Sequence, residues 1–122
     1  MGSGRKQLGI RVEAEDSISI VRLAGSIDAA NLSDFENILE SVCSGSRPRV
    51  LLDCHKLAYV NSTSYDLLFH FHRICKTHRG RLGLFGVPKK IMPILKLLGL
   101  DSILSLFSTK AEALTALRKP AR

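Results

Sequence analysis

The sequence is poor in cysteine and has no long apolar run. Its three cysteines, Cys43, Cys54 and Cys75, are widely spaced, odd in number and without a CxxC pair. This pattern argues against a disulfide framework, a zinc site or a dithiol redox motif, so we interpret them as small reduced apolar residues in a cytoplasmic protein. No apolar run reaches the roughly 20 residues that a membrane-spanning helix needs, and membrane insertion is not expected.

Acidic and aromatic residues are also scarce. The chain has 11 Asp+Glu against 18 Lys+Arg, a formal net charge of +7, and only 6% aromatic residues. A basic chain suggests an anionic partner. The sequence nevertheless lacks an RNP or GXXG motif and interleaved aromatic residues, so a nucleic-acid partner is not expected.

The positive charge is unevenly distributed along the chain. Residues 8–66 contain 5 Lys+Arg and 9 Asp+Glu, whereas residues 67–117 contain 8 and 2. The remaining five basic residues lie in the two end segments. Such polarity favours an oriented protein partner over a nucleic-acid backbone.

Length and composition indicate one globular domain. The chain has 122 residues, 45% of them hydrophobic, which is enough for a core that folds alone. We interpret residues 1–7 as an expression-tag remnant and disordered start, residues 8–117 as the domain and residues 118–122 as a basic tail.

Hydrophobic periodicity predicts alternating strands and helices after an initial hairpin. The expected strands are 9–13, 18–23, 50–53, 82–87 and 103–107. The first helix is expected from about Asp28 to Cys43, capped by Asp28 or Asn31. Three more helices follow: one ended by Gly80, one closed by Gly99, and one capped by Ser108 or Thr109. The order ββαβαβαβα implies an α/β fold with a mixed, mostly parallel sheet covered by helices.

Most candidates for chemistry have plainer interpretations. His70 and His72 are two residues apart on a helix and face different directions, and no further ligands accompany Cys75 and His78. His55 precedes Ser62 by seven residues on what we expect to be a loop, but no nucleophile elbow or acid-His-Ser order is present. The sequence therefore predicts neither a metal site nor an enzyme.

The polar cluster Asn61-Ser62-Thr63-Ser64 is the most informative segment. It lies between an apolar strand and an amphipathic helix, where free N–H groups and the helix dipole favour added negative charge. Thr63 followed by Asp66 fits a capping box, which accounts for one hydroxyl but not for three. The cluster is a plausible phosphorylation site.

Four segments together resemble, in order and spacing, the STAS domain of anti-sigma factor antagonists. The resemblance covers about residues 8 to 117 and is carried by Gly25-Ser26-Ile27-Asp28-Ala29-Ala30-Asn31, Leu51-Leu52-Asp53, Tyr59-Val60-Asn61-Ser62-Thr63-Ser64 and Leu97-Leu98-Gly99-Leu100-Asp101.

The resemblance implies a switchable protein-interaction domain. Ser62 occupies the position of the hydroxyl that a partner anti-sigma kinase phosphorylates, and that kinase brings its own ATP and magnesium, so the chain itself needs no cofactor. The unphosphorylated form would bind the anti-sigma factor or serine kinase, and the phosphorylated form would not. The residues expected to bind the partner are Asp28, Asn31, Asn61, Thr63 and Ser64.

Two positions depart from the family pattern and support an alternative. Asn61 replaces the acid before the hydroxyl, and Ser64 replaces the glycine two residues after it. The alternative hypothesis is a STAS scaffold or transport-accessory subunit that binds its partner constitutively, without phosphorylation. The sequence leaves the partner's identity and the oligomeric state open.

Overall fold

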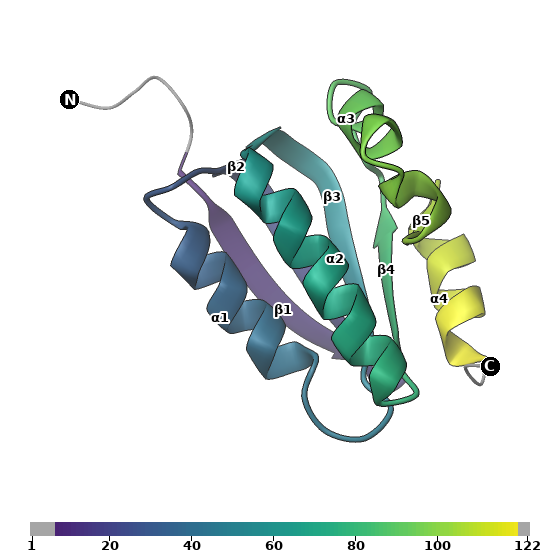
Figure 1. Ribbon diagram of the computed structural model, residues 1–122. Helices are drawn as coiled ribbons and strands as arrows, with labels where there is room; N and C mark the ends of the chain where they lie inside the picture. The colour runs from purple at the N-terminus through teal and green to yellow at the C-terminus, as the bar shows by residue number, and fades with distance from the viewer. Residues whose placement is uncertain (1–6, 120–122) are drawn as a thin grey trace.

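Five strands form one mixed sheet in the computed structural model, which describes residues 7–119 (Figure 1). Their order in the sheet is that of the sequence: β1 (Gly9–Glu15), β2 (Ile18–Ile27), β3 (Arg49–Val60), β4 (Arg81–Phe85) and β5 (Ser105–Phe107). β1 is antiparallel to β2 and the other pairs are parallel. The mixed, mostly parallel sheet is confirmed, whereas the expectations for residues 1–6 and 120–122 lie outside the described residues.

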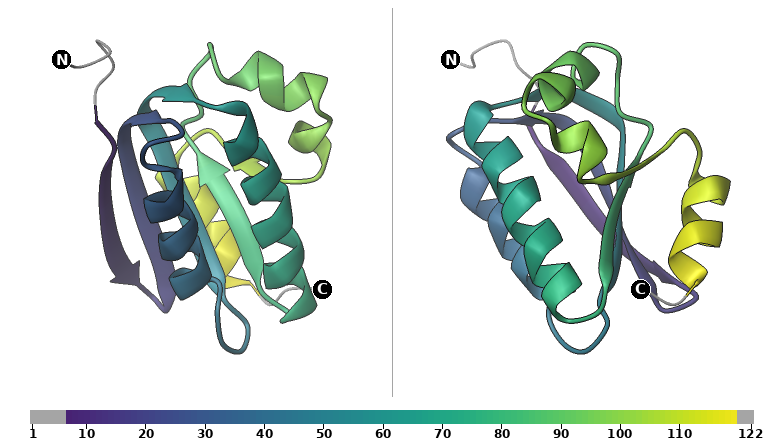
Figure 2. Two further views of the ribbon diagram at one scale, coloured as in Figure 1. Left: turned by 60° about the vertical axis from the view of Figure 1, so that its left-hand side comes forward. Right: turned by 45° about the vertical axis from the view of Figure 1, so that its right-hand side comes forward.

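Helices cover both faces of the sheet (Figure 2). α1 (Leu32–Val42) and α2 (Ser62–Thr77) lie on one face and α4 (Lys110–Arg118) on the other, while α3 (Met92–Leu97) and a short 3₁₀ helix, η1 (Leu100–Ser102), lie over one end. The order ββαβαβαβα is therefore confirmed, with η1 added before β5. Arg118, which we assigned to the basic tail, is the last residue of α4.

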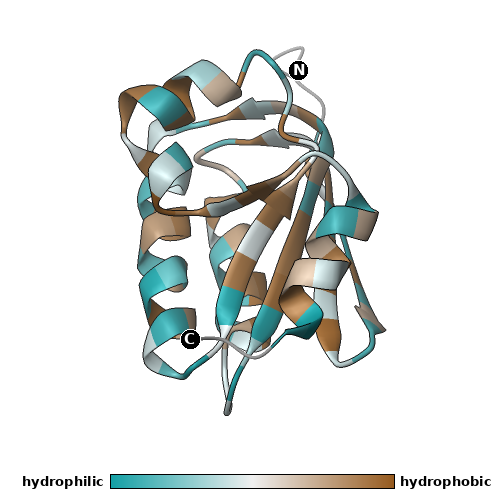
Figure 3. Cartoon of the chain, turned by 90° about the vertical axis from the view of Figure 1, so that its right-hand side faces the viewer, coloured by the Kyte–Doolittle hydropathy of each residue, from teal (hydrophilic) through white to brown (hydrophobic). Residues whose placement is uncertain are grey.

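Alternation along the strands separates two apolar cores. The larger core packs β2 and β3 against α1 and α2 and includes Val21, Phe35, Leu52 and Phe71. The smaller core lies under α4; its buried members are Ile18, Ile20, Leu51, Phe85, Ala113, Leu114 and Leu117. Figure 3 shows the hydrophobic strand segments enclosed between helices whose outer sides are polar. The strands are apolar on both sides where helices cover both sides, as in buried parallel sheets.

A tight turn joins β1 to β2. Its central residues, Asp16 and Ser17, have φ angles of 52° and 65°, as a type I′ turn requires. This turn fits the right-handed twist of the two strands, and it occurs where the hydrophobic alternation of the sequence is broken.

Several predicted boundaries are wrong. β2 continues past Leu23 to Ile27, and β4 ends at Phe85 rather than at Val87. β3 continues past Asp53 to Val60, because two extra residues bulge out of its pairing with β2 and hide the alternation in the sequence. α1 begins at Leu32 rather than near Asp28, because Asp28 belongs to a hydrogen-bonded loop. β5 is only Ser105–Phe107, since the preceding residues form η1 and a turn.

Gly80 follows the end of α2, but the reason for a glycine at this position differs from the predicted one. The left-handed conformation after the helix is taken by Arg79, with φ 62°. A Cβ at position 80 would lie 2.0 Å from the Pro48 carbonyl oxygen. Gly80 is therefore required by the close approach of two backbones rather than by its own conformation.

Candidate partner-binding site

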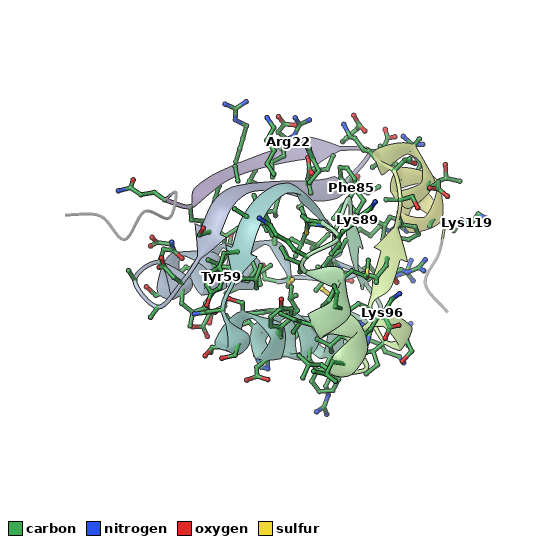
Figure 4. The ribbon with its side chains drawn as sticks, turned by 90° about the horizontal axis from the view of Figure 1, so that it is seen from above. Arg22, Tyr59, Phe85, Lys89, Lys96 and Lys119 are labelled. Atoms are coloured by element: carbon green, nitrogen blue, oxygen red, sulfur yellow. The ribbon has the colours of Figure 1, made fainter. Side chains whose placement is uncertain are left out.

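Two polar segments of the chain meet at the edge where β2 and β3 end. Ile27 and Val60, the last residues of these strands, are in register, and the Asn61 N–H donates to the Ile27 carbonyl at 2.9 Å. The loop between β2 and α1 and the first turn of α2 are therefore held side by side. Figure 4 looks down on this edge and labels Tyr59, the residue before the end of β3. Binding sites of open α/β sheets commonly lie at the carboxyl ends of parallel strands.

The β2–α1 loop is fixed by its own side chains. Asp28 Oδ1 accepts from the backbone N–H groups of Ala30 at 3.0 Å and Asn31 at 3.3 Å. Asn31 Oδ1 accepts from the Asp28 N–H at 3.0 Å, and its Nδ2 donates to the Ser26 carbonyl at 2.9 Å. Asn31 occupies the N-cap position of α1, as predicted, but neither side chain makes a cap hydrogen bond to the helix, because both are used inside the loop. The loop therefore presents Asp28 in a defined position.

Asn61 caps α2. Its Oδ1 accepts from the Ser64 N–H at 3.0 Å and from the Ser64 hydroxyl at 2.5 Å. An asparagine makes the same cap hydrogen bonds as an aspartate but carries no charge. The predicted capping box of Thr63 and Asp66 is wrong, because α2 already begins at Ser62.

Ser62 and Thr63 are the first two residues of α2, and both are exposed. Neither hydroxyl makes a hydrogen bond among residues 7–119. The first turn of α2 has no acidic residue, and its free N–H groups and helix dipole favour an anion there. A phosphate on Ser62 would thus meet a favourable local field and no carboxylate on the helix's first turn.

Ser64 and Tyr65 point into the protein. Both are buried, and burial raises the pKa of the Tyr65 hydroxyl, with a smaller contribution from Tyr59. Within the described part of the chain, that hydroxyl has no hydrogen-bond partner. Because Ser64 is buried and bonded to Asn61, its side chain is not available to a partner in this conformation, and it serves to fix the start of α2.

His55 lies in β3 rather than on a loop, and it does not approach the hydroxyl cluster. Its imidazole Nδ1 contacts Asp53 Oδ1. Val60 is five positions further along β3, a distance of about 17 Å along an extended strand. An acid–imidazole pair is thus present, but the nucleophile of a triad is not beside it. Across residues 7–119 there is no group of three or more His, Cys, Asp or Glu that could hold a metal ion.

The remaining candidate residues, the cysteines and the helix histidines, lie away from the polar cluster in sequence or are buried. Cys43, Cys54 and Cys75 are buried free thiols. On α2, His70 is exposed, and burial next to Lys76 lowers the pKa of His72. No helix in the span 7–119 is long and apolar enough to cross a membrane.

The sequence matches the STAS domain family over residues 9–113, and the chain belongs to this family. Solved structures that are similar to this chain include anti-sigma factor antagonists. This family is non-enzymatic, so the prediction that the chain is not an enzyme is confirmed.

Three solved structures illustrate the similarity. An anti-sigma factor antagonist from Mycobacterium paratuberculosis is 25% identical, with a TM-score of 0.83 over 93% of this chain and 96% of that one. An anti-sigma factor antagonist (STAS) domain protein from Planctomyces limnophilus is 23% identical, with a TM-score of 0.77 over 90% and 98%. The Bacillus cell fate determinant SpoIIAA in its phosphorylated form is 15% identical, with a TM-score of 0.68 over 88% and 98%.

Proposed function

We propose that this STAS domain binds an anti-sigma factor or serine kinase in the cytoplasm, and that phosphorylation of Ser62 ends the binding. The observation that carries the proposal is the exposed, unbonded hydroxyl of Ser62 at the start of α2, beside the fixed loop of Asp28 and Asn31. The docking surface consists of Asp28, Asn31, Asn61, Ser62 and Thr63. SpoIIAA, which has the same fold, is described in both unphosphorylated and phosphorylated forms.

The chemistry of the surface supports a switch. A phosphoserine adds a charge of about −1.5 to −2 at pH 7. At a docking surface this group must lose part of its hydration and would repel carboxylates of the partner, so the complex is weakened. The fold itself is not opposed, because the helix N-terminus favours the same charge. Ser62 thus sits where phosphorylation alters binding more than folding.

The departure at position 61 is compatible with this mechanism. Asn61 retains both cap hydrogen bonds to Ser64, so the helix start is preserved without the family's carboxylate. Removing that carboxylate also removes a negative charge next to the phosphate. A kinase that requires an acid before the hydroxyl would nevertheless not act on this chain.

Phosphorylation is tested by incubating the chain with anti-sigma kinases from its own genome and ATP, followed by mass spectrometry. We expect one phosphate on Ser62 in the wild type and none on Ser62→Ala. Thr63→Ala tests the neighbouring hydroxyl, and Ser108→Ala, which removes an exposed hydroxyl before α4, is the matched control. Phosphate on Thr63 in the wild type would move the switch by one residue, and an unmodified chain with every kinase would refute it.

Binding is tested separately with the same kinases by calorimetry. We expect Ser62→Asp to weaken the complex at least about tenfold, the effect of roughly 1.4 kcal/mol, and Asp28→Asn to weaken it through the adjacent loop. The alternative, a constitutive scaffold, is favoured by the replacement of the family's acid and glycine at positions 61 and 64. It predicts a partner that Ser62→Asp binds as tightly as the wild type.

A further inference from the structure

The face of the sheet toward α4 changes from apolar to charged along β2 and β3. β2 presents Ile18 and Ile20 to the smaller core and then Arg22. β3 presents Leu51 to the same core and then Asp53. Figure 4 shows Arg22 on the side of the sheet opposite α2, beyond the part that α4 covers. On β2 and β3, the apolar side chains of this face therefore lie under α4, and the charged side chains begin beyond it.

A groove of about 310 Å³ occupies this open part of the face. Gly9 and Ala24 lie side by side in it with little side-chain volume, since β1 and β2 pair them directly. On the other side, the bulge between Asp53 and Lys56 adds one residue to β3 and tilts the local strand. The groove thus results from two small residues, Gly9 and Ala24, on one wall and from the extra residue of the β3 bulge on the other.

Together with the buried Asp53, basic side chains from three neighbouring strands line the groove: Arg11, Arg22, His55 and Lys56. Arg11 is directly opposite Arg22 in the register of β1 and β2, and like charges in that position are destabilising. Arg22 pairs with Glu13 at 3.1 Å, but neither Arg11 nor Lys56 forms an ion pair within residues 7–119. Two cations therefore remain uncompensated at the hollow.

His55 is held in place at the groove. Asp53, only 4% exposed, accepts from the His55 backbone N–H at 3.2 Å and contacts the imidazole Nδ1. The ring lies beside Phe85 with 6.5 Å between centroids, and Gly86 leaves room for it, because a Cβ there would be 2.9 Å from the His55 Cβ. The side chain is 54% exposed. Asp53 thus takes one ring nitrogen and leaves Nε2 free for a ligand.

We propose that this groove binds a small phosphate dianion through Arg11, Arg22, His55 and Lys56. A dianion near Arg11 would offset its repulsion with Arg22, and guanidinium groups donate paired hydrogen bonds to phosphate oxygens. Asp53 also lines the groove, but it is only 4% exposed, and its Oδ1 accepts from the His55 backbone N–H and contacts the imidazole, so we assign it the role of positioning His55. The site lies on the face opposite α2 and does not depend on the Ser62 switch.

Nuclear magnetic resonance titration tests the site on the whole chain. Inorganic phosphate and glycerol 3-phosphate are added separately at constant ionic strength, with sodium chloride as the reference. We expect saturable shifts of the Gly9, Ala24 and Lys56 amides with phosphate and not with chloride. Tighter binding of glycerol 3-phosphate identifies an organic phosphomonoester as the ligand, and equal binding identifies the phosphate group alone.

Charge-matched variants separate a site from general attraction. Arg11→Gln combined with Lys56→Gln should weaken phosphate binding at least about tenfold. Lys89→Gln combined with Lys90→Gln, at two exposed lysines before α3, removes the same charge and should leave binding unchanged. Ser62→Ala should also bind as the wild type does. Shifts that do not saturate, or an equal loss in both double variants, would overturn the proposal.

A stability measurement gives an independent check. In phosphate-free buffer, Arg11→Gln should raise or maintain the melting temperature, because it removes a like-charge pair. Added phosphate should raise the melting temperature of the wild type and not that of the groove double variant. A loss of stability in Arg11→Gln together with an unchanged phosphate effect would show that Arg11 is structural only.

Discussion

On one face of the sheet, α1 and α2 cover β2 and β3 through a buried cluster that runs from Val21 to Leu104 in sequence. On the other face, α4 is the one helix that contributes to a cluster of seven buried residues within residues 7–119, and three of the seven are its own. The proposed docking surface includes Asn61, the N-cap of α2, at the edge of this first face. The phosphate groove occupies the part of the second face that α4 leaves open. One face therefore carries the helix that begins at Ser62, the proposed phosphorylation site, while the other leaves charged side chains such as Arg22 partly exposed.

The two faces should also differ in stability. α2 has 16 residues and α4 has nine, so α2 buries more apolar surface and needs more bonds broken to open. Elements with fewer buried contacts open locally at lower free energy. In native-state hydrogen exchange we therefore expect the α4 amides to exchange before those of α2.

The largest predicted effect compares one buried residue from each face. Phe71→Ala on α2 should lower the free energy of unfolding by about 3–5 kcal/mol, and Leu117→Ala on α4 by about 2–3 kcal/mol. Both side chains are buried, but the smaller core under α4 can collapse more easily into the space left. Urea denaturation measures both values.

The matched control for this comparison is Phe69→Ala. Phe69 lies on the same helix as Phe71 but is 38% exposed, with the Arg73 guanidinium carbon 5.8 Å from its ring centroid. Its replacement should change stability by less than about 1 kcal/mol. If Leu117→Ala proves more destabilising than Phe71→Ala, α4 is the stronger anchor and the comparison between the faces is reversed.

The next effect compares the two side-chain caps. Asn61→Ala should destabilise the protein by about 1–2 kcal/mol, because it removes the cap of α2 and leaves the buried Ser64 hydroxyl without its acceptor. Thr109→Ala removes the cap of α4, where Thr109 Oγ1 accepts from the Glu112 N–H at 3.2 Å in an exposed position. It should destabilise by only about 0.5–1 kcal/mol.

Conservative replacements sharpen the result for the caps. Asn61→Asp keeps the cap acceptor and should be nearly as stable as the wild type, and Thr109→Ser should behave likewise. Thermal unfolding of the four variants measures the differences. Equal losses of stability for Asn61→Ala and Thr109→Ala would mean that the Ser64 hydroxyl finds another acceptor. The start of α2 would then be no better fixed than the start of α4.

The element order could be predicted from the sequence because helical and strand periodicities differ. The stripe of Leu67, Leu68, Phe71 and Cys75 recurs at three- and four-residue steps, and tertiary packing agrees with it. The second half of β3 could not be predicted, because two bulges shift the alternation and make Cys54–Tyr59 read as irregular. The bulges are defined by how β3 pairs with β2, and the hydrophobic periodicity of one segment contains no information about that pairing.

The candidate site was only partly predictable. The position of Ser62 at the start of a helix follows from the polar cluster before an apolar stripe. The roles of its neighbours depend on one residue of helix register: since α2 begins at Ser62, Asn61 becomes the cap and Ser64 is buried. The groove proposed to bind phosphate cannot be predicted from the sequence, because it joins β1, β2 and β3 across the sheet. Like charges at Arg11 and Arg22 become visible as a pair only in the register of the hairpin.

The smallest effect concerns the ion pairs that hold α4. Arg118 Nη2 lies 2.6 Å from Asp16 Oδ2, with side chains 47% and 57% exposed, and Lys110 pairs with Glu15 at 3.7 Å. Exposed pairs contribute roughly 0.2–1 kcal/mol, so Arg118→Ala should lower the unfolding free energy by no more than that. A double-mutant cycle with Asp16→Asn, which tolerates the positive φ of this turn position, isolates the coupling between the two side chains.

Salt dependence distinguishes this contribution from packing. In 1 M salt, where the Debye length is about 3 Å, the coupling of Arg118 to Asp16 should largely vanish. The loss caused by Phe71→Ala should remain, because it arises from apolar packing rather than from charge. A coupling above about 2 kcal/mol, or one that persists in 1 M salt, would show that α4 is held by a desolvated ion pair. In that case the two faces of the sheet would be stabilised to similar extents by different forces.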